Sequence, residues 1–268
     1  YALRVYNRTR AKVEALIHEG ALWKESPAEL ARDVEVVISV VSDSPDVEAV
    51  YLGPEGVCGA LRSGTLCIDM STIAPEIARS VAAEVARVGG SFLDAPVSGG
   101  KTGAEAGTLS IMVGGNERDV ARAKPIFEVL GKSTVHCGPV GNGQLTKLCN
   151  QVLCGLNLLA ASEAMVFARR VGLDPATMLT AVSKGAAGSW ALDNLGPRML
   201  TRDFAPMFMI DLQQKDLRIA LSTACQSDVP LPGTSLVTQL LAANQAAGEG
   251  REGTQALVKT LERLAHLQ

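Results

Sequence analysis

The sequence predicts an α/β domain built on a doubly wound, mostly parallel sheet, followed by an all-helical domain. In the first half of the 268-residue chain, short β-branched runs alternate with helical stretches, and this alternation is typical of a doubly wound sheet. Residues 34–41 (VEVVISVV) form an almost unbroken apolar run, as expected of a strand buried on both faces of a parallel sheet. After residue 141 no convincing strand pattern follows.

The elements of the first half follow in chain order. Strands are expected over residues 3–7, 34–41, 65–70, 91–97, 109–113 and 134–137. Helices are expected over residues 10–19, 75–88 and 119–130. The second of these helices has Thr72 ahead of it as a candidate cap, Pro75 in its first turn and Gly89-Gly90 as a stop signal.

The second half is expected to be entirely helical. Apolar residues recur at helical spacing from 145 to 167 and predict one long helix over residues 144–170 that joins two domains. Further helices are expected over residues 175–184, 190–200, 208–226, 233–247 and 254–266. The predicted domains are therefore residues 1–139, which carry the sheet, and residues 140–268, which are all-helical.

Composition excludes several classes of partner. The formal net charge of -3 argues against nucleic acid or an anionic membrane surface. No uninterrupted apolar run approaches the roughly 20 residues that cross a bilayer. The spacing of the six cysteines suits neither a metal site nor a disulfide framework, so we expect reduced thiols in a cytoplasmic protein without a metal.

The tip of the first strand carries a cofactor signal. In a dinucleotide-binding Rossmann fold, an acidic residue about 20 positions after the Gly-rich loop holds the ribose hydroxyls of NAD. Here the strand ends in Asn7, Arg8 and Thr9, and arginine with a hydroxyl suits a 2′-phosphate. We therefore predict NADP, bound by these three residues, with NAD as the alternative. The competing interpretation is that Arg8 is only a solvated loop charge.

The Gly-rich phosphate loop itself is not in the sequence. No G-x-G-x-x-G motif occurs, and counting back about 20 residues from Asn7 places that loop before residue 1. We therefore expect a Rossmann domain that lacks its first strand and helix in this numbering.

Three further segments carry a distinctive combination of motifs. They are residues 94–100 (DAPVSGG), 141–151 (GNGQLTKLCNQ) and 215–217 (KDL). Together with residues 69–72 (DMST) and the strand tip at residues 7–9, they resemble the β-hydroxyacid dehydrogenase family. Within it the chain resembles 3-hydroxyisobutyrate dehydrogenases, tartronate semialdehyde reductases and glyoxylate/succinic semialdehyde reductases. The resemblance covers essentially the whole chain.

The resemblance implies a hydride transfer between NAD(P)(H) and a short hydroxy acid or semialdehyde. It implies that Lys147 is the catalytic lysine, that Thr72 lies near the nicotinamide end, and that Lys215 closes over the cofactor. The glycine-rich loop would hold the substrate carboxylate through exposed backbone N–H groups, and its residues are Ser98, Gly99 and Gly100.

Two assignments depart from the family pattern or are less direct. The family often has an asparagine four residues after the lysine, whereas this chain has Asn150 three after and Gln151 four after. Both amides lie one turn along the helix from Lys147, so either could support it. Asp216, next to Lys215, is expected to contact the substrate.

The chemistry that the residues themselves allow agrees with this. Reduction of an aldehyde needs a hydride and a proton for the developing alkoxide. A lysine near a helix start and against an apolar wall gives up its proton more readily than a solvated one, so Lys147 can act as general acid and base. The alternative is a lysine on a wet helix face, and the surrounding motif speaks against it.

Other functions remain in competition at this stage. The main alternative is a catalytically inactive nucleotide-sensing or dimerisation module of the same fold, which the missing Gly-rich loop favours and Lys147, Ser98 and Thr72 oppose. An imine reductase would usually replace the lysine. The apolar helical half predicts a homodimer or homotetramer. Apart from further copies of this chain, the expected partner of the protein is a small-molecule substrate.

Overall fold

The computed structural model describes residues 1–267, which form two compact units. The first unit contains the sheets, and the second contains most of the helices that follow. The first comprises Tyr1–Gly99 and Gly103–Lys147, and the second comprises Gly100–Thr102 and the chain from Leu148 onward.

The division between the units falls inside the long helix α7 (Asn142–Arg170), between Lys147 and Leu148. The boundary expected from the sequence, between residues 139 and 140, lies just ahead of this helix. Helix α7 is continuous over 29 residues. Its residues 142–147 belong to the first unit, and the rest of the helix belongs to the second.

The larger sheet of the first unit begins with three parallel strands. They are β3 (Val36–Ser39), β4 (Leu66–Asp69) and β5 (Ser91–Asp94), neighbours in that order. Next to β5 lies the antiparallel strand β7 (Leu109–Gly114), and β8 (Gly131–Gly138) pairs with β7 in parallel. A Rossmann-type sheet is thereby confirmed, and its strands β7 and β8 run antiparallel to β3, β4 and β5.

The strand expected over residues 91–97 is divided into two. β5 ends at Asp94, and β6 (Val97–Ser98) continues along β7 after Pro96. Proline has no N–H to donate to a neighbouring strand, but its carbonyl still accepts the backbone N–H of Met112 at 3.0 Å.

A second, small sheet pairs β1 (Arg4–Val5) in parallel with β2 (Leu22–Trp23). Within residues 1–267, no strand pairs with the other edge of β1 or with the free edge of β3. The side chains of Ile38 and Val40, in and just after β3, are exposed. Among the described residues, the larger sheet therefore ends at β3 on this side.

Side chains on the parallel strands alternate between the two faces of the sheet. Val37, Cys67 and Phe92 occupy one row of the register and pack in a core with α3 (Ser44–Leu52) and α4 (Pro75–Arg87). Both faces of β4 and β5 are covered, which explains why the sequences of these two strands are apolar without a period of two.

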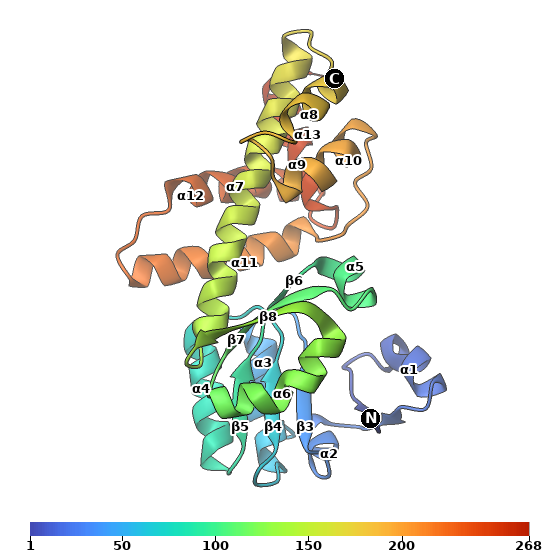
Figure 1. The fold of residues 1–268 in the computed structure, drawn as a ribbon, viewed down its shortest axis with the longest axis vertical. Coiled ribbons are helices and arrows are strands. Elements are labelled where there is room, and N and C mark those ends of the chain that lie inside the picture. The colour runs from blue at the N-terminus through green and yellow to red at the C-terminus, as the bar shows by residue number, and fades with distance from the viewer. Residues whose placement is uncertain (268) are drawn as a thin grey trace. The chain divides into compact units, whose positions relative to one another are not determined.

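The opposite face is covered by α6 (Glu117–Leu130), as Figure 1 shows. Its fully buried side chains Ala123 and Phe127 pack in a second core with Ile68 and Leu93 of the sheet. Helices on both faces of a mostly parallel sheet make this a doubly wound domain.

Three short helices and one strand were not predicted from the sequence. The missed elements are β2, α2 (Pro27–Ala31), α3 and α5 (Gly100–Glu105). The start of α3 carries a signal that was overlooked, because Asp43 accepts the backbone N–H of Ser44 at 2.7 Å and Pro45 occupies the first turn. Thr72 does not cap α4, whose N-cap is Ala74.

The helical domain is confirmed. Beyond β8 the described residues form helices, apart from one isolated bridge between Met209 and Gly253. The helix expected over residues 190–200 is two helices. The elements are α7, α8 (Pro175–Val182), α9 (Trp190–Asn194), α10 (Gly196–Leu200), α11 (Ile210–Gln226), α12 (Pro232–Ala246) and α13 (Leu257–Leu264).

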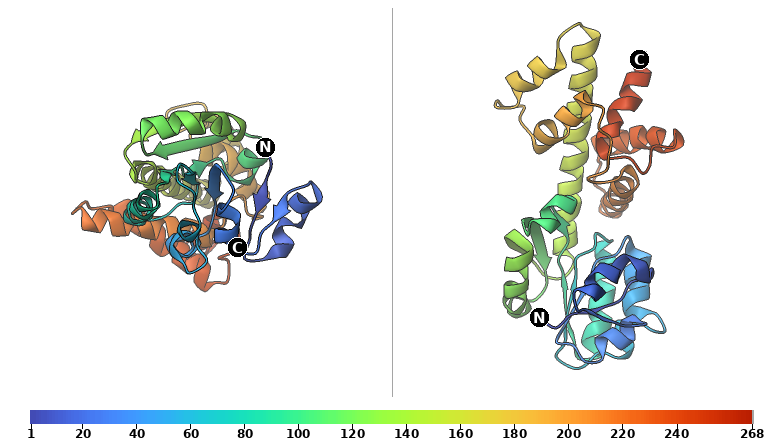
Figure 2. Two further views of the ribbon diagram at one scale, coloured as in Figure 1. Left: turned by 90° about the horizontal axis from the view of Figure 1, so that it is seen from below. Right: turned by 90° about the vertical axis from the view of Figure 1, so that its right-hand side faces the viewer.

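Helix α7 is the core helix of the second unit. The right-hand view of Figure 2 shows α8 (gold) on one side of it and the C-terminal helices (red) on the other. By length and composition α7 could cross a membrane, but Leu158, Met165 and Val166 are buried among the other helices of this unit. A core helix of a globular domain passes the same test of length and composition.

A buried polar network ties α3 to the sheet. Asp69, at the end of β4, accepts hydrogen bonds at Oδ1 from the hydroxyls of Ser39 (2.6 Å) and Ser71 (2.8 Å). The Ser39 hydroxyl also lies 3.0 Å from the phenol oxygen of Tyr51, which is fully buried on α3. Asp69 Oδ2 has no hydrogen-bond partner among the described residues, and burial raises the pKa of Asp69 to about 6.

Asp69 should therefore make the stability of the protein pH-dependent. Because its folded-state pKa lies above the ordinary value of 3.8, the folded protein holds the extra proton between about pH 4 and 6. The free energy of unfolding should fall as the pH rises through that window, by about 3 kcal/mol in total. Urea unfolding of the wild type and of Asp69→Asn at several pH values measures this. Above pH 7 the difference between their free energies of unfolding should no longer depend on pH. Equal slopes between pH 4 and 6 would contradict it.

Candidate active site

Lys147 lies in the second turn of α7, in the first unit, and its residue is only 6% exposed. The residue therefore does not lie on a wet helix face. Its position is set by where α7 begins, because a helix rises only 1.5 Å per residue and turns through a fixed angle.

The start of α7 is held by Asp94, which is fully buried at the end of β5. Asp94 Oδ1 accepts the backbone N–H of Gly141 at 2.8 Å, and Oδ2 accepts that of Gln144 at 2.9 Å. Burial raises the pKa of Asp94, and these two backbone hydrogen bonds oppose the rise. The carboxyl group thus satisfies two N–H groups that a helix start leaves without intrahelical partners.

Two glycines make this close approach possible. A Cβ on Gly114 would collide with the Asp94 carboxylate, and a Cβ on Gly143 would collide with the carbonyl oxygens of Asp94 and Met112. The strand end and the helix start can meet only where both positions lack a side chain. Gly143 belongs to the motif around Lys147, so that glycine has a structural reason.

The Ser98-Gly99-Gly100 loop turns the chain from β6 into α5. Ser98 is half-buried, and both glycines are exposed. Gly99 (φ +136°) and Gly100 (φ +60°) have backbone conformations that favour glycine. The two glycines therefore present backbone without side chains.

Thr72 follows β4 in the short segment that leads to α4, and it is half-buried. Its neighbour Ser71 is anchored, because the Ser71 hydroxyl accepts the backbone N–H of Val41 at 2.8 Å and donates to Asp69. This segment lies at the carboxyl end of a parallel strand, where doubly wound folds bind their ligands.

In the second unit the structure brings four predicted site residues into one cluster. Asp216 is 2% exposed; its Oδ2 accepts the amide of Gln151 at 2.6 Å, and its Oδ1 lies 2.7 Å from the ammonium group of Lys215. Asn150 donates from Nδ2 to Gln151 Oε1 at 2.8 Å. The buried carboxylate therefore holds Gln151 and Lys215, and Gln151 is the amide that it orders.

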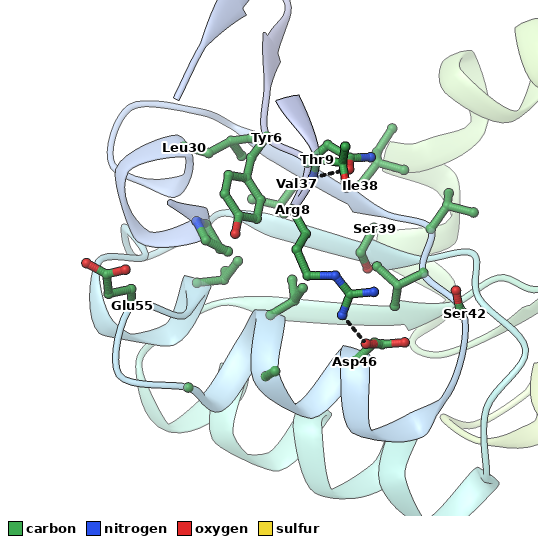
Figure 3. A pocket seen from close by; sticks show the side chains of 18 of the residues that line it. Tyr6, Arg8, Thr9, Leu30, Val37, Ile38, Ser39, Ser42, Asp46 and Glu55 are labelled. Atoms are coloured by element: carbon green, nitrogen blue, oxygen red, sulfur yellow. Dashed lines mark hydrogen bonds and ion pairs between the residues drawn. The ribbon is translucent and has the colours of Figure 1, made fainter. Parts of the chain in front are cut away.

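Asn7, Arg8 and Thr9 line a cavity of about 690 Å³ in the first unit, a size in the range of small-molecule sites. The Asn7 side chain accepts the backbone N–H of Thr9 at 2.9 Å and shapes the turn. In Figure 3 Arg8 extends from this turn to Asp46 on α3, with its guanidinium 3.3 Å from the carboxylate. The other wall is the end of β3 and the loop after it, residues 37–42.

The predicted site residues thus lie in three groups within the described structure. One lines the cavity at residues 7–9, one lies at the sheet edge and the start of α7, and one is the cluster around Asp216. Sequence reasoning missed four residues that hold these groups: Asp46, Asp69, Asp94 and Gln144. Asp69, Asp94 and Gln144 belong to the family motifs, and an acid at the end of a buried strand was the signal that could have singled out Asp69 and Asp94.

Comparison with known proteins agrees with this architecture. Residues 1–138 match the family of the NAD binding domain of 6-phosphogluconate dehydrogenase. Residues 141–261 match the family of the NAD-binding domain of NADP-dependent 3-hydroxyisobutyrate dehydrogenase.

Individual relatives extend over nearly the whole chain. A 2-hydroxy-3-oxopropionate reductase of Escherichia coli is 40% identical over 94% of this chain and 87% of its own length. The 3-hydroxyisobutyrate dehydrogenase of Mycobacterium tuberculosis, solved with L-serine, has a TM-score of 0.90 at 30% identity over 97% of this chain and 91% of its own. The protein Psf3, solved with NADP+ and 2-OPP, has a TM-score of 0.89 at 27% identity over 97% of this chain and 92% of its own.

Two matching family domains in this order, relatives at about 40% identity and a shared two-unit fold lead to one conclusion. The chain belongs to the 3-hydroxyisobutyrate dehydrogenase family, and it is an NAD(P)-dependent dehydrogenase of the β-hydroxyacid type.

Proposed function

We propose that this enzyme transfers a hydride between NADP(H) and a short hydroxy acid or its semialdehyde, with Lys147 as the proton donor and acceptor. The observation that carries the proposal is the burial of Lys147 near the start of a helix whose origin Asp94 holds. A buried ammonium group at this position can act as a general acid and, once deprotonated, as a general base.

In the direction of reduction, NADPH held by this domain would supply the hydride that reduces the carbonyl carbon. The carbonyl oxygen then carries developing negative charge, and the ammonium group of Lys147 donates a proton to it. In the direction of oxidation the neutral amine of Lys147 takes the hydroxyl proton. Acid–base help of this kind contributes about 10²–10⁴ in rate.

The loop of Ser98, Gly99 and Gly100 is proposed to bind the substrate carboxylate. The left-handed backbone of Gly99 and Gly100 supports this, because successive N–H groups in such a conformation can converge on an anion. In the second unit, Gln151 and Asn150 are proposed to support Lys147, and Lys215 to close over the cofactor. Asp216 binds Gln151 and Lys215. We propose that Asp216 also contacts the substrate.

The substrate class follows from what the relatives are named for. 2-Hydroxy-3-oxopropionate, 3-hydroxyisobutyrate and L-serine share a carboxylate and an oxygen on the third carbon. We propose a substrate with the same two groups. The test is NADPH oxidation by the full-length protein with tartronate, methylmalonate and succinic semialdehydes and with glyoxylate. Rapid turnover of tartronate or methylmalonate semialdehyde would support this class, and rapid turnover of only succinic semialdehyde or glyoxylate would overturn it. NADPH binding without turnover of any would favour the nucleotide-sensing module instead.

The cofactor is proposed to be NADP rather than NAD. Arg8 and the turn of Asn7 and Thr9 offer a cation and hydrogen-bonding groups at the mouth of the cavity, with no acid among them. Thr72 is proposed to lie near the nicotinamide end. The relative Psf3 was solved with NADP+. Asp46 pairs with Arg8, so a 2′-phosphate would share or replace that contact.

Assembly and location are proposed on separate grounds. Large apolar side chains on the second unit, including Leu153, Phe167 and Val171, are exposed, and we propose that they are covered in a homodimer or homotetramer. The six cysteines are all thiols rather than disulfides, and three of them are exposed, which favours a reducing compartment such as the cytoplasm.

Lys147→Met should lower kcat by about 10²–10⁴-fold, while the Kd for NADPH stays within about twofold because the lysine does not hold the adenosine end. Steady-state kinetics and fluorescence titration measure the two quantities. The control is Lys124→Met, which removes an exposed lysine from α6 in the same unit. Undiminished kcat in Lys147→Met would remove this residue from the mechanism.

Arg8→Ala should lower the ratio of kcat/KM for NADPH to kcat/KM for NADH by about 10- to 100-fold, because a charge-assisted contact to the 2′-phosphate is lost. The matched control is Arg87→Ala, which removes another exposed arginine with an acidic partner, Glu84. An unchanged ratio in Arg8→Ala would show that Arg8 is a solvated loop charge.

A further inference from the structure

Gln144 is a fully buried polar residue in the first turn of α7, three positions before Lys147. Burying an amide side chain costs free energy unless its donor and acceptor are both used. Here both are used, and both partners belong to one short backbone segment 71 to 73 residues away in the sequence.

The side chain of Gln144 brackets Thr72. Its Oε1 accepts the backbone N–H of Ile73 at 3.1 Å, and its Nε2 donates to the backbone carbonyl of Ser71 at 2.9 Å. The two hydrogen bonds fall on the residues immediately before and after Thr72. They also determine the orientation of the amide, since turning it over would place NH₂ against an N–H and one oxygen against another.

The same residue is held through its main chain. The backbone N–H of Gln144 donates to Asp94 Oδ2 at 2.9 Å, which ties α7 to the end of β5, while the side chain ties it to the end of β4. The Ser71 segment is anchored from its other side as well, by Val41 and Asp69. The Gln144 side chain that links the Thr72 segment to the first turn of α7 is fully buried, and both ends of its amide are hydrogen-bonded.

We propose that Gln144 is a positioning residue for catalysis: it holds the Thr72 segment at one register against the helix turn that carries Lys147. This rests on the proposed function, in which Thr72 lies at the nicotinamide end and Lys147 transfers the proton. The geometries of hydride transfer and proton transfer are then fixed together. The reason is that the buried amide of Gln144 joins the Thr72 segment, at the nicotinamide end, to the helix turn that carries Lys147.

Loss of this amide should slow the chemical step more than it weakens binding. A displacement of about 1 Å of a catalytic group can cost on the order of 10²-fold in rate. The Asp94 contacts to Gly141 and Gln144 use backbone N–H groups and survive substitution of the side chain. The helix therefore still starts at its place, and what is lost is its link to the Thr72 segment.

The test compares Gln144→Met with Gln255→Met in the full-length protein. Methionine keeps the volume and removes both hydrogen bonds. Gln255 is the matched control: it is 1% exposed in the second unit and donates to two backbone carbonyls, those of Asp203 (2.9 Å) and Ala205 (3.1 Å), on either side of one residue. The two substitutions remove similar buried amides, so a general loss of stability should affect both.

For Gln144→Met we expect kcat to fall about 10- to 100-fold, with the KM for NADPH within about twofold of wild type. With NADPH deuterated at the transferred position, the isotope effect on kcat should rise, because hydride transfer becomes the slow step in place of product release. Gln255→Met should keep both the wild-type kcat and the wild-type isotope effect.

A second variant keeps the test open if Gln144→Met does not fold. A protonated glutamic acid can replace both hydrogen bonds, whereas an ionised one lacks the donor to Ser71. The charged groups around the site are Asp94 on β5, Asp69 on β4, Arg79 on α4 beside Gly141, and Lys147 in the next turn. The kcat of Gln144→Glu relative to wild type should rise as the pH falls from 8 to 5.

The outcomes separate the two proposals. The positioning role would be overturned if Gln144→Met kept the kcat and the isotope effect of the wild type, or if the kcat of Gln144→Glu relative to the wild type did not depend on pH. Turnover by the wild-type enzyme would in either case leave the proposed function intact. Equal losses of kcat in Gln144→Met and Gln255→Met, without a change of isotope effect, would also overturn it. Absence of turnover in the wild type with every semialdehyde would defeat the proposed function itself.

Discussion

The interaction on which the rest of the structure depends is the contact between the Asp94 carboxylate and the start of α7. A buried carboxyl group is tolerated only where hydrogen bonds replace its water, and here two backbone N–H groups of the helix start supply them. The contact fixes where a 29-residue helix begins. Lys147, in the same unit, takes its position from that origin.

Around this contact the carboxyl edge of the sheet is unusually polar for a buried region. Asp69, Asp94 and Gln144 are all 0% exposed, and each joins segments far apart in the chain. Asp69 links β3 to β4 and carries a raised pKa; Gln144 links β4 to α7. Such polar groups add little net stability for their number, since their desolvation offsets much of the gain. Their value lies in allowing one arrangement of the edge and no other.

The family membership and the site geometry support each other at different levels. The matched domains and relatives establish a nicotinamide-dependent dehydrogenase of the β-hydroxyacid type. The geometry adds which side chains are buried, which are paired and which remain at a surface. Arg8, for instance, stays exposed at the mouth of its cavity with Asp46 as its partner, whereas Asp216 is enclosed by Gln151 and Lys215.

The sequence by itself determined the two-part fold, the long helix and the motifs around Lys147, because periodicity and turn residues act locally and leave a local record. It could not reveal the short helices α2 and α5, which have too few residues for a period, nor the split of the strand at Pro96. Only the tertiary structure decided that Gln144 meets residues 71 and 73 and that Asp216 is buried. Such pairs depend on the register of strands and the packing of helices, and neither leaves a pattern in neighbouring residues.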